Sequence, residues 1–236
     1  MSDSWVSRLL ASLERGASLQ DIARSAAFVD VLGRIAGLLA RTGVTPNTLT
    51  LASLVPALVS GVLAAYGAFG WAIVFLLMSG AFDMLDGPLA RTTGTVSRFG
   101  ALLDSTVDRI TDAAPLLGLT VFYATSGWMA VVPAFTLLAA YTVSYVRARC
   151  EGLKVQLPPL WMRRGDRMAL IALALLAGLA SPMLALAAIG VVGGLSLLAA
   201  ADALRVARLV IEARTPDLPA GTAAASDTAS GRDAIP

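Results

Sequence analysis

Apolar segments of about twenty residues follow one another through most of this chain, and their length limits the folds available to it. A helix of about 20 apolar residues crosses the hydrocarbon core of a bilayer, where helices and closed barrels alone satisfy every backbone group. The 236 residues are 57% hydrophobic and 14% charged, with a mean hydropathy of +0.75. We therefore predict an all-α integral membrane protein whose six transmembrane helices span about residues 45–66, 71–91, 98–122, 128–151, 166–181 and 183–214.

Charged residues lie at alternate ends of these segments. The loops near residues 67–71, 123–128 and 181–183 carry no charge. The opposite ends carry Arg41, Arg91, Arg98, Arg147, Arg149, Arg163, Arg164, Arg167, Arg205 and Arg208. Cytoplasmic loops of membrane proteins are enriched in arginine and lysine. The pattern predicts a multi-pass protein of the cell (plasma) membrane with both termini and its polar segments on the cytoplasmic side.

The two ends of the chain differ from its middle. Residues 1–42 contain apolar residues at helical spacing between positions 28 and 39, which predicts a juxtamembrane amphipathic helix on the cytoplasmic membrane surface. A helix packed on the protein's own flank fits the same pattern. Thr45 and Pro46 then begin a six-helix transmembrane domain over residues 43–214, and Pro56 predicts a kink in its first helix. Residues 215–236, rich in Ala, Thr, Ser, Asp and Pro, predict a disordered cytoplasmic tail.

Four aspartates interrupt the apolar pattern between residues 83 and 108. Asp83 and Asp86 are three residues apart, and Asp104 and Asp108 are four apart, so on helices each pair lies on one face. Four ionised carboxylates at close range repel unless a positive group holds them together. Carboxylate oxygens are the ligands that Mg²⁺, Mn²⁺ and Ca²⁺ prefer. The pattern predicts two helices around a two-metal phosphoryl-transfer site, with ordinary helix-end charges as the alternative.

The rest of the composition excludes several other kinds of site. The chain has no histidine, so a histidine base, a histidine metal ligand and a Ser-His triad are all excluded. Cys150 is the single cysteine, which excludes an internal disulfide and a cysteine metal site. Lys154 is the single lysine, so the positive charge is almost wholly arginine, which suits bidentate contact with phosphate.

The acidic segment reads D-x2-D-G-x2-A-R-x8-G-x3-D-x3-D, and it resembles the signature of the CDP-alcohol phosphotransferase family. The matching residues are Asp83, Asp86, Gly87, Ala90, Arg91, Gly100, Asp104 and Asp108. The resemblance covers most of residues 43–212. It implies an enzyme of phospholipid biosynthesis that transfers a phosphatidyl-type group from a CDP-lipid, such as CDP-diacylglycerol, to an alcohol and releases CMP.

The resemblance also implies a metal cofactor and a base. The cofactor would be Mg²⁺ or Mn²⁺, as two ions, with Asp83, Asp86, Asp104 and Asp108 as the metal ligands. Asp108 would in addition be the catalytic base that accepts the proton of the alcohol. Asp112, one turn further on, would sit deeper in the membrane, and we predict that it either supports the metal ligands from behind or pairs with an arginine, and is not a metal ligand itself.

A CDP-lipid pocket and a homodimer are implied in the same way. The residues of that pocket would be Asp83, Gly87, Ala90, Arg91 and Gly100. Other roles stay open on the residues alone. Gly87 and Ala90 also fit close helix packing, and Arg91 also fits an arginine that extends to the membrane interface.

A second polar set bears on the acceptor alcohol. Arginines in residues 144–151 and 163–167 indicate an anionic group beside the metals, hence an alcohol that already carries phosphate. Membrane anchoring and anionic lipid headgroups are the alternative. Both segments are similar to the phosphatidylinositol-phosphate synthase branch of the family, with arginine for lysine at position 147 and changes at positions 163 and 165. The residues that match its acceptor-phosphate site are Ser144, Arg147, Arg164 and Arg167.

The branch resemblance implies inositol 1-phosphate as the acceptor, with glycerol 3-phosphate as the alternative because both are anionic. A cation transporter that uses the carboxylates as its ion site is an alternative of another class, and an inactive membrane scaffold is a third. Transporters tend to show repeated halves with broken helices, and no repeat is visible here. The expected partners are therefore the CDP-lipid, the phosphorylated alcohol and membrane lipids, without nucleic acid.

Overall fold

The computed structural model describes residues 26–155, 157–158 and 161–214, and all regular structure within these ranges is helical. The helices are α3 (Ala26–Arg41), α4 (Pro46–Ala52), α5 (Leu54–Ala65), α6 (Phe69–Thr93), α7 (Arg98–Phe122), the 3₁₀ segment η1 (Ala124–Ala130), α8 (Val131–Gly152), α9 (Arg164–Gly178) and α10 (Pro182–Arg214). In the described ranges, four spans are long and apolar enough to cross a membrane: Pro46–Ala65, Phe69–Thr93, Ala124–Gly152 and Pro182–Glu212. The prediction of an all-α membrane protein is confirmed.

Two of the six predicted crossings are not among these four spans. α7 carries four charged residues between positions 104 and 112. α9 begins at Arg164, two residues before Asp166, ends at Gly178 rather than at Ser181, and has 15 residues. At 1.5 Å per residue it is about 22 Å long, which is shorter than the ~30 Å hydrocarbon core. The exact number of six crossings therefore stays a prediction.

The first predicted membrane helix is divided in two. As the sequence predicts, Thr45 caps it: Thr45 Oγ1 accepts a hydrogen bond from Thr48 N at 3.2 Å, and Pro46 is its first residue. The sequence also predicts a kink at Pro56, and the helix is interrupted three residues earlier, at Ser53, whose carbonyl accepts a hydrogen bond from the Ser79 hydroxyl of α6 at 2.9 Å. Pro56 lies in the first turn of α5, and its missing N–H removes the helical hydrogen bond to the carbonyl of residue 52, where α4 ends.

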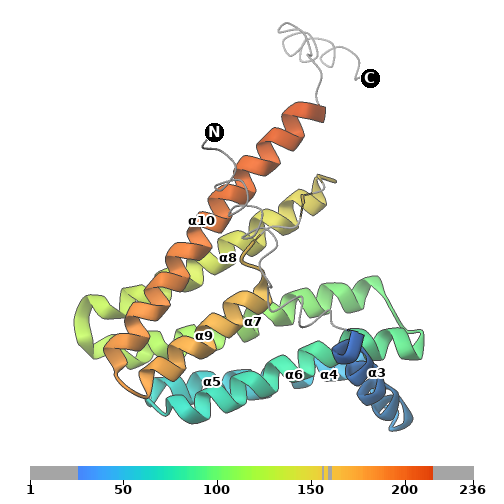
Figure 1. The fold of residues 1–236 in the computed structure, drawn as a ribbon, viewed down its shortest axis with the longest axis horizontal. Helices are drawn as coiled ribbons and strands as arrows, with labels where there is room; N and C mark the ends of the chain where they lie inside the picture. The colour runs from blue at the N-terminus through green and yellow to red at the C-terminus, as the bar shows by residue number, and fades with distance from the viewer. Residues whose placement is uncertain (1–25, 156, 159–160, 215–236) are drawn as a thin grey trace, which may run out of the picture.

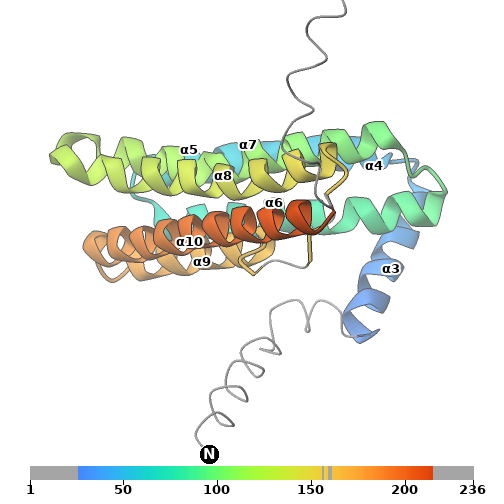
Figure 2. The same cartoon turned by 90° about the horizontal axis from the view of Figure 1, so that it is seen from above.

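The helices form two layers. Figure 2 shows α5, α7 and α8 in one layer and α6, α9 and α10 in the other. Helix α5 packs on α6 and α7, α8 packs on α7 and α10, and α9 packs on α6 and α10. Helix α3 lies across the end of α6 (Figure 1). This arrangement leaves the acidic ends of α6 and α7 close to the first turn of α9.

Apolar side chains cover both the inside and the outside of the bundle. Leu76, Leu116 and Leu175 of the main core are 2%, 0% and 0% exposed. On the outer surface, Leu117 and Leu138 are 52% and 65% exposed. A broad apolar surface of this kind favours association in water, whereas lipid chains solvate it. The outward leucines therefore support a membrane environment.

Helix α3 occupies part of the predicted juxtamembrane region. Ala36 packs with Leu49 of α4 and Leu89 of α6, while Val31 and Leu38 are 51% and 62% exposed. Packing on the protein's own flank thus coexists with an exposed apolar side. Contact of that side with the membrane stays a prediction. Residues 1–25 and the predicted tail at 215–236 lie outside the described residues.

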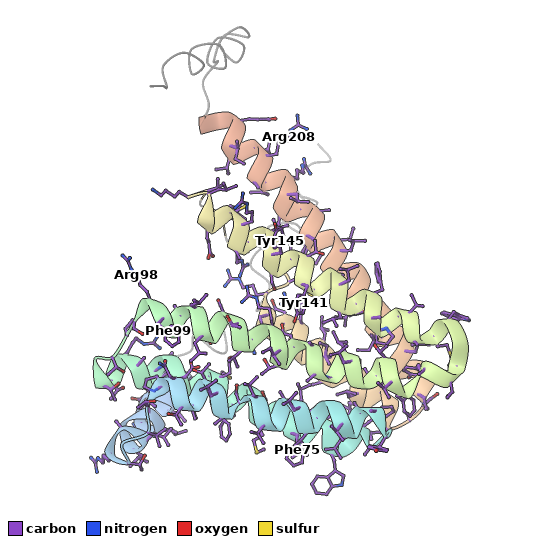
Figure 3. The ribbon with its side chains drawn as sticks, turned by 180° about the vertical axis from the view of Figure 1, so that it is seen from behind. Phe75, Arg98, Phe99, Tyr141, Tyr145 and Arg208 are labelled. Atoms are coloured by element: carbon purple, nitrogen blue, oxygen red, sulfur yellow. The ribbon has the colours of Figure 1, made fainter. Side chains whose placement is uncertain are left out.

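Helices α8 and α10 extend side by side away from α6 and α7 at one end (Figure 1). Helix α10 has 33 residues. In this extension, Val146 and Cys150 of α8 form a small apolar cluster with Ala203 and Ala207 of α10. Helices α7 and α8 diverge toward the same end, as the positions of Phe99 and Tyr145 in Figure 3 show. They are joined by the Tyr141 hydroxyl, which donates to the carbonyl of Arg109 at 2.9 Å.

Helices α5 and α7 cross at two glycines. A Cβ on Gly118 would overlap the carbonyl oxygen of Gly61, and a Cβ on Gly61 would overlap the backbone of Ala114. The two backbones are therefore in contact, as in membrane helix pairs that meet at small residues.

Gly118→Ala is expected to lower the free energy of unfolding by about 1–3 kcal/mol, because the two backbones must move apart. Thermal unfolding of the purified protein in detergent measures the change. Gly194→Ala in α10 is the matched control, since no atom lies within 4 Å of a Cβ at that glycine. Equal unfolding temperatures for the two variants would contradict the close crossing.

Candidate metal and substrate site

Three aspartates from α6 and α7 bring their carboxylates together. Asp83, Asp104 and Asp108 each offer an oxygen, and the three oxygens lie within 4.8 Å of one another. Gly94, at a φ of +66°, ends α6, and Ser97 caps α7 by accepting a hydrogen bond from Gly100 N at 3.0 Å. This short connection returns the chain so that the three carboxylates share one space. Their number, spacing and partial exposure suit a divalent cation with oxygen ligands.

Asp86, the fourth predicted metal ligand, has a different partner. Its side chain is 9% exposed, and Oδ2 accepts a hydrogen bond from the Thr50 hydroxyl at 2.6 Å. Among the described residues, Asp86 is outside the group of carboxylates that approach within 4.8 Å. It lies one turn along α6 from Asp83, next to the group. Its role as a metal ligand stays a prediction.

Arg164, in the first turn of α9, lies among three carboxylates. Its Nη1 donates to Asp83 Oδ2 at 2.5 Å and lies 3.1 Å from Asp108 Oδ1. Its Nε donates to Asp112 Oδ1 at 3.1 Å, and its Nη2 donates to the Thr111 hydroxyl at 2.9 Å. One guanidinium thus offsets part of the repulsion among the acids and ties α9 to both α6 and α7.

Asp112 is paired with arginine, which is one of the two roles that the sequence predicts for it. Its Oδ1 accepts from Arg164, and its Oδ2 accepts from Arg167 Nη2 at 3.2 Å. Arg167 is 3% exposed and also donates to the Ser144 hydroxyl at 3.3 Å. Two arginines of α9, an aspartate of α7 and a serine of α8 therefore form one polar network.

A cavity of about 180 Å³ opens on this network, and we name it the inner pocket. Four arginines and three acids line it, which gives a formal charge of +1 (4 − 3). The lining residues are Ser105, Asp108, Arg109, Asp112, Val143, Ser144, Arg147, Ala148, Glu151, Arg164 and Arg167. All four residues predicted for the acceptor phosphate are included, together with Asp108 of the carboxylate group. The structure thus brings the predicted acceptor residues to the predicted base.

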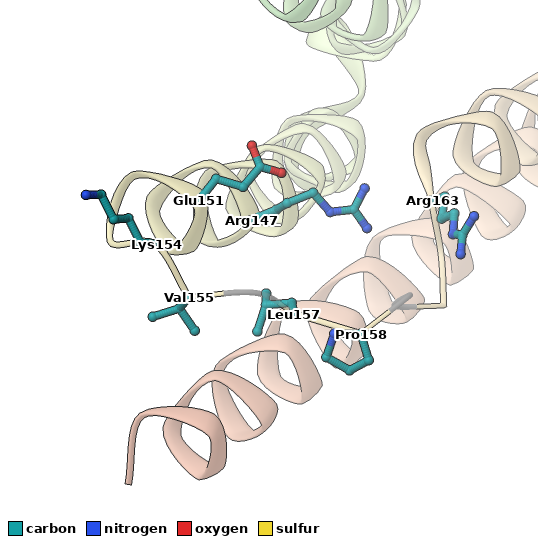
Figure 4. A pocket seen from close by; sticks show the side chains of 7 residues that line it. All are labelled: Arg147, Glu151, Lys154, Val155, Leu157, Pro158 and Arg163. Carbon is teal, nitrogen blue, oxygen red and sulfur yellow. The ribbon is translucent and has the colours of Figure 1, made fainter. Parts of the chain in front are cut away.

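A larger cavity of about 760 Å³, the outer pocket, adjoins the inner one. Arg147 and Glu151 line both, and the outer pocket adds Lys154, Val155, Leu157, Pro158 and Arg163. Figure 4 shows Arg147 extending from α8 toward the side on which Arg163 lies. The two pockets together run from the α8–α9 connection to the carboxylates.

The residues predicted for the CDP-lipid lie at the motif end of α6 and the start of α7. Arg91 is exposed and folds back over Gly87, because a Cβ at Gly87 would lie 3.5 Å from Arg91 Nη1. A Cβ at Gly100 would lie 3.3 Å from Asn47 Oδ1, so the start of α7 is close to α4. Ala90 is partly buried beside them. Gly87, Ala90, Arg91 and Gly100 therefore lie near the carboxylates, and their contact with a nucleotide stays a prediction.

Three further residues at the site were not predicted from the sequence. Arg109 directly follows Asp108, and Glu151 ends the arginine-rich run that begins at Ser144, so both had a signal in their neighbours. No feature of the sequence near Thr50 indicated its role, because its partner Asp86 is 36 residues away in the chain.

The matching family model and the named relatives agree on one family. Residues 43–200 match the family model for CDP-alcohol phosphatidyltransferase. A phosphatidylinositol phosphate synthase of Mycobacteroides abscessus is 34% identical over 152 residues, 61% of this chain and 67% of that protein. One from Streptomyces avermitilis is 37% identical over 150 residues, 61% of each chain. An archaetidylinositol phosphate synthase of Pyrococcus horikoshii is 43% identical over 125 residues, 51% of this chain and 62% of that protein. The matched segments thus span about three fifths to two thirds of these relatives.

Solved structures share the fold. The crystal structure of Mycobacterium tuberculosis phosphatidylinositol phosphate synthase with CDP-DAG bound aligns with a TM-score of 0.69 at 24% identity, over 75% of this chain and 94% of that one. The same protein in complex with manganese and citrate aligns equally well, over 75% of this chain and 88% of that one. At this identity the likeness shows the arrangement of helices.

Thr50→Val is expected to weaken divalent-cation binding by about ten- to a hundredfold, because the hydroxyl that orients the Asp86 carboxylate is lost. The measurement is the Mn²⁺ concentration that gives half-maximal protection against thermal unfolding. Thr120→Val is the matched control, since its hydroxyl donates only within its own helix, to Leu116 O at 2.8 Å. The same Mn²⁺ requirement in both variants would show either that Asp86 is not a metal ligand or that its metal binding does not depend on Thr50.

Proposed function

Because the chain belongs to the CDP-alcohol phosphatidyltransferase family, we propose that it transfers a phosphatidyl-type group from CDP-diacylglycerol to inositol 1-phosphate and releases CMP. The observation that carries this proposal is the shared position of Asp108 and Arg164. Asp108 belongs to the carboxylate group and Arg164 contacts it, and both residues line the arginine-rich inner pocket. A metal-held CDP-lipid and an anionic alcohol can therefore meet at one carboxylate.

The donor half of the site is proposed to hold Mg²⁺ or Mn²⁺, as two ions, on Asp83, Asp86, Asp104 and Asp108. When bound, divalent cations offset the charge of the diphosphate and stabilise the charge that develops on departing CMP. Gly87, Ala90, Arg91 and Gly100 would hold the CDP-lipid beside them. The solved structures of a relative with CDP-DAG and with manganese support this assignment.

Asp108 is the proposed base. The hydroxyl oxygen of the acceptor attacks the phosphorus that carries the lipid, and a new P–O bond forms there. The bond from that phosphorus to the bridging oxygen of the diphosphate breaks, and CMP leaves with its electron pair. Asp108 takes the hydroxyl proton, which a carboxylate at hydrogen-bond distance can do. Its place on the inner pocket puts it next to any alcohol whose phosphate the arginines hold.

The acceptor is proposed from the charge of the inner pocket. Ser144, Arg147, Arg164 and Arg167 line it together and can bind a phosphate through charge-assisted hydrogen bonds. Relatives named as phosphatidylinositol phosphate synthases favour inositol phosphate. Glycerol 3-phosphate carries the same charge and is the alternative acceptor.

The proposed setting is the plasma membrane, with the site and both termini cytoplasmic. Loops near 67–71, 123–128 and 181–183 carry no charge, and the arginines gather at the other ends, which supports this orientation. A homodimer is proposed from the family resemblance.

The proposal is tested with the purified protein in detergent, CDP-diacylglycerol and Mg²⁺. Inositol 1-phosphate, glycerol 3-phosphate, serine and free inositol are supplied separately, and CMP release is measured. We expect CMP with inositol 1-phosphate, none with free inositol, and none after removal of divalent cations with EDTA. CMP with glycerol 3-phosphate alone would reassign the acceptor, and no CMP with any alcohol would overturn the transferase proposal.

Asp108→Asn is expected to lower the rate of CMP release by about 10²–10⁴-fold, because the base is lost while the side-chain size is kept. Because Asp108 is also a proposed metal ligand, binding of CDP-diacylglycerol at saturating Mg²⁺ is measured by calorimetry, and the loss of turnover should exceed the loss of binding. Asp202→Asn, on α10 and outside both pockets, is the control. A variant with near-normal turnover would show that Asp108 is not the base.

A further inference from the structure

Asp112 lies outside the acidic motif, yet it holds two arginines of the inner pocket. Its side chain is 9% exposed. One oxygen accepts from Arg164 Nε at 3.1 Å, and the other accepts from Arg167 Nη2 at 3.2 Å. Among the described residues, it is not part of the group of carboxylates that approach within 4.8 Å. Its described ion pairs are therefore with the arginines rather than with the proposed metal site.

Each of these arginines is fixed by further contacts. Arg164 also reaches Asp83 and Thr111. Arg167 also donates to the Ser144 hydroxyl at 3.3 Å and to the carbonyl of Met162 at 3.4 Å. Its buried Nε has no hydrogen-bond partner among the described atoms, so this guanidinium is not saturated by the protein.

Two guanidinium groups that line one small pocket repel each other. A buried carboxylate between them reduces that repulsion and sets the plane of each group. Bidentate recognition of phosphate requires such fixed planes, because the N–H pairs must match the phosphate oxygens. Asp112 is the residue that meets this need on both arginines at once.

We propose that Asp112 is a positioning residue that fixes Arg164 and Arg167 for the acceptor phosphate, and that it thereby sets the preference for a phosphorylated over a neutral alcohol. This inference rests on the proposed function. Asp112 does not touch the reacting atoms, and its effect passes through the two arginines.

The test compares Asp112→Asn with the wild-type protein in the CMP-release assay, and calorimetry with inositol 1-phosphate measures acceptor binding directly. Asparagine keeps the size of the side chain, but its amide nitrogen cannot accept a hydrogen bond from the second arginine. We expect the KM for inositol 1-phosphate to rise about tenfold or more, with the KM for CDP-diacylglycerol unchanged and kcat little affected. Asp30→Asn removes an exposed aspartate that pairs with Arg34 at 2.7 Å, and this control should change none of these constants.

A double variant tests whether Asp112 acts through its partner. Residues that act together show combined effects that differ from the product of the single effects. We expect Asp112→Asn with Arg167→Gln to raise the acceptor KM by less than the product of the two single changes. Independent, multiplying effects would overturn the positioning role.

The outcomes separate this inference from the proposed function. Wild-type protein that releases CMP, together with an Asp112→Asn variant in which both KM values rise equally or neither changes, overturns the inference alone. Wild-type protein that neither releases CMP nor binds inositol 1-phosphate overturns both. If Asp112→Asn does not fold, Asp112→Glu keeps the negative charge but lengthens the side chain, so the carboxylate no longer meets both arginines in the same planes. A severalfold rise in the acceptor KM alone is then expected, and an unchanged acceptor KM would overturn the inference.

Discussion

The pairing of Arg164 with three aspartates is the interaction on which the polar interior depends. Ionised carboxylates inside an apolar bundle are costly unless they are paired. Arg164 contacts Asp83 of α6 and both Asp108 and Asp112 of α7. It can do so because Asp166 accepts a hydrogen bond from Arg163 N at 2.9 Å, so that α9 begins at the level of the acids. The ion pairs thus set the place of α9 as well as the charge of the site.

The aspartates of helix α7 make two kinds of contact, with the carboxylate of α6 and with the arginines of α9. Asp104, Asp108 and Asp112 follow one another every four residues, and each step turns about 40° around the helix at 3.6 residues per turn. The first two approach Asp83 on α6, while the third meets the arginines of α9. Asp108 lies between Asp104 and Asp112 on the helix, and it belongs both to the carboxylate group and to the lining of the inner pocket. A single helix therefore joins the carboxylate group to the inner pocket without a loop between them.

Much of this could be predicted from the sequence, because apolar length and residue spacing are local properties. Helix α7 matched its predicted bounds, and Asp112 paired with arginine, one of its two predicted roles. The features that could not be predicted depend on contacts between segments that are distant in the sequence. The hydrogen bond from Ser79 to the carbonyl of Ser53 and the bond from Thr50 to Asp86 each join residues that are far apart in the sequence. Likewise, the position of Arg164 at the carboxylates depends on residues 52 and 81 positions away.

Helix α10 is longer than a bilayer crossing requires. Its 33 residues extend for about 50 Å at 1.5 Å per residue, whereas the hydrocarbon core is ~30 Å thick. Residues 182–201 carry no charge and match that thickness, whereas Asp202, Arg205, Arg208 and Glu212 follow them, so the last part of α10 protrudes from the hydrocarbon core. Its far end packs on the end of α8, next to the residues that line the outer pocket. The end of α8 that lines the outer pocket is therefore held beyond the hydrocarbon core, in the layer where water and lipid headgroups meet.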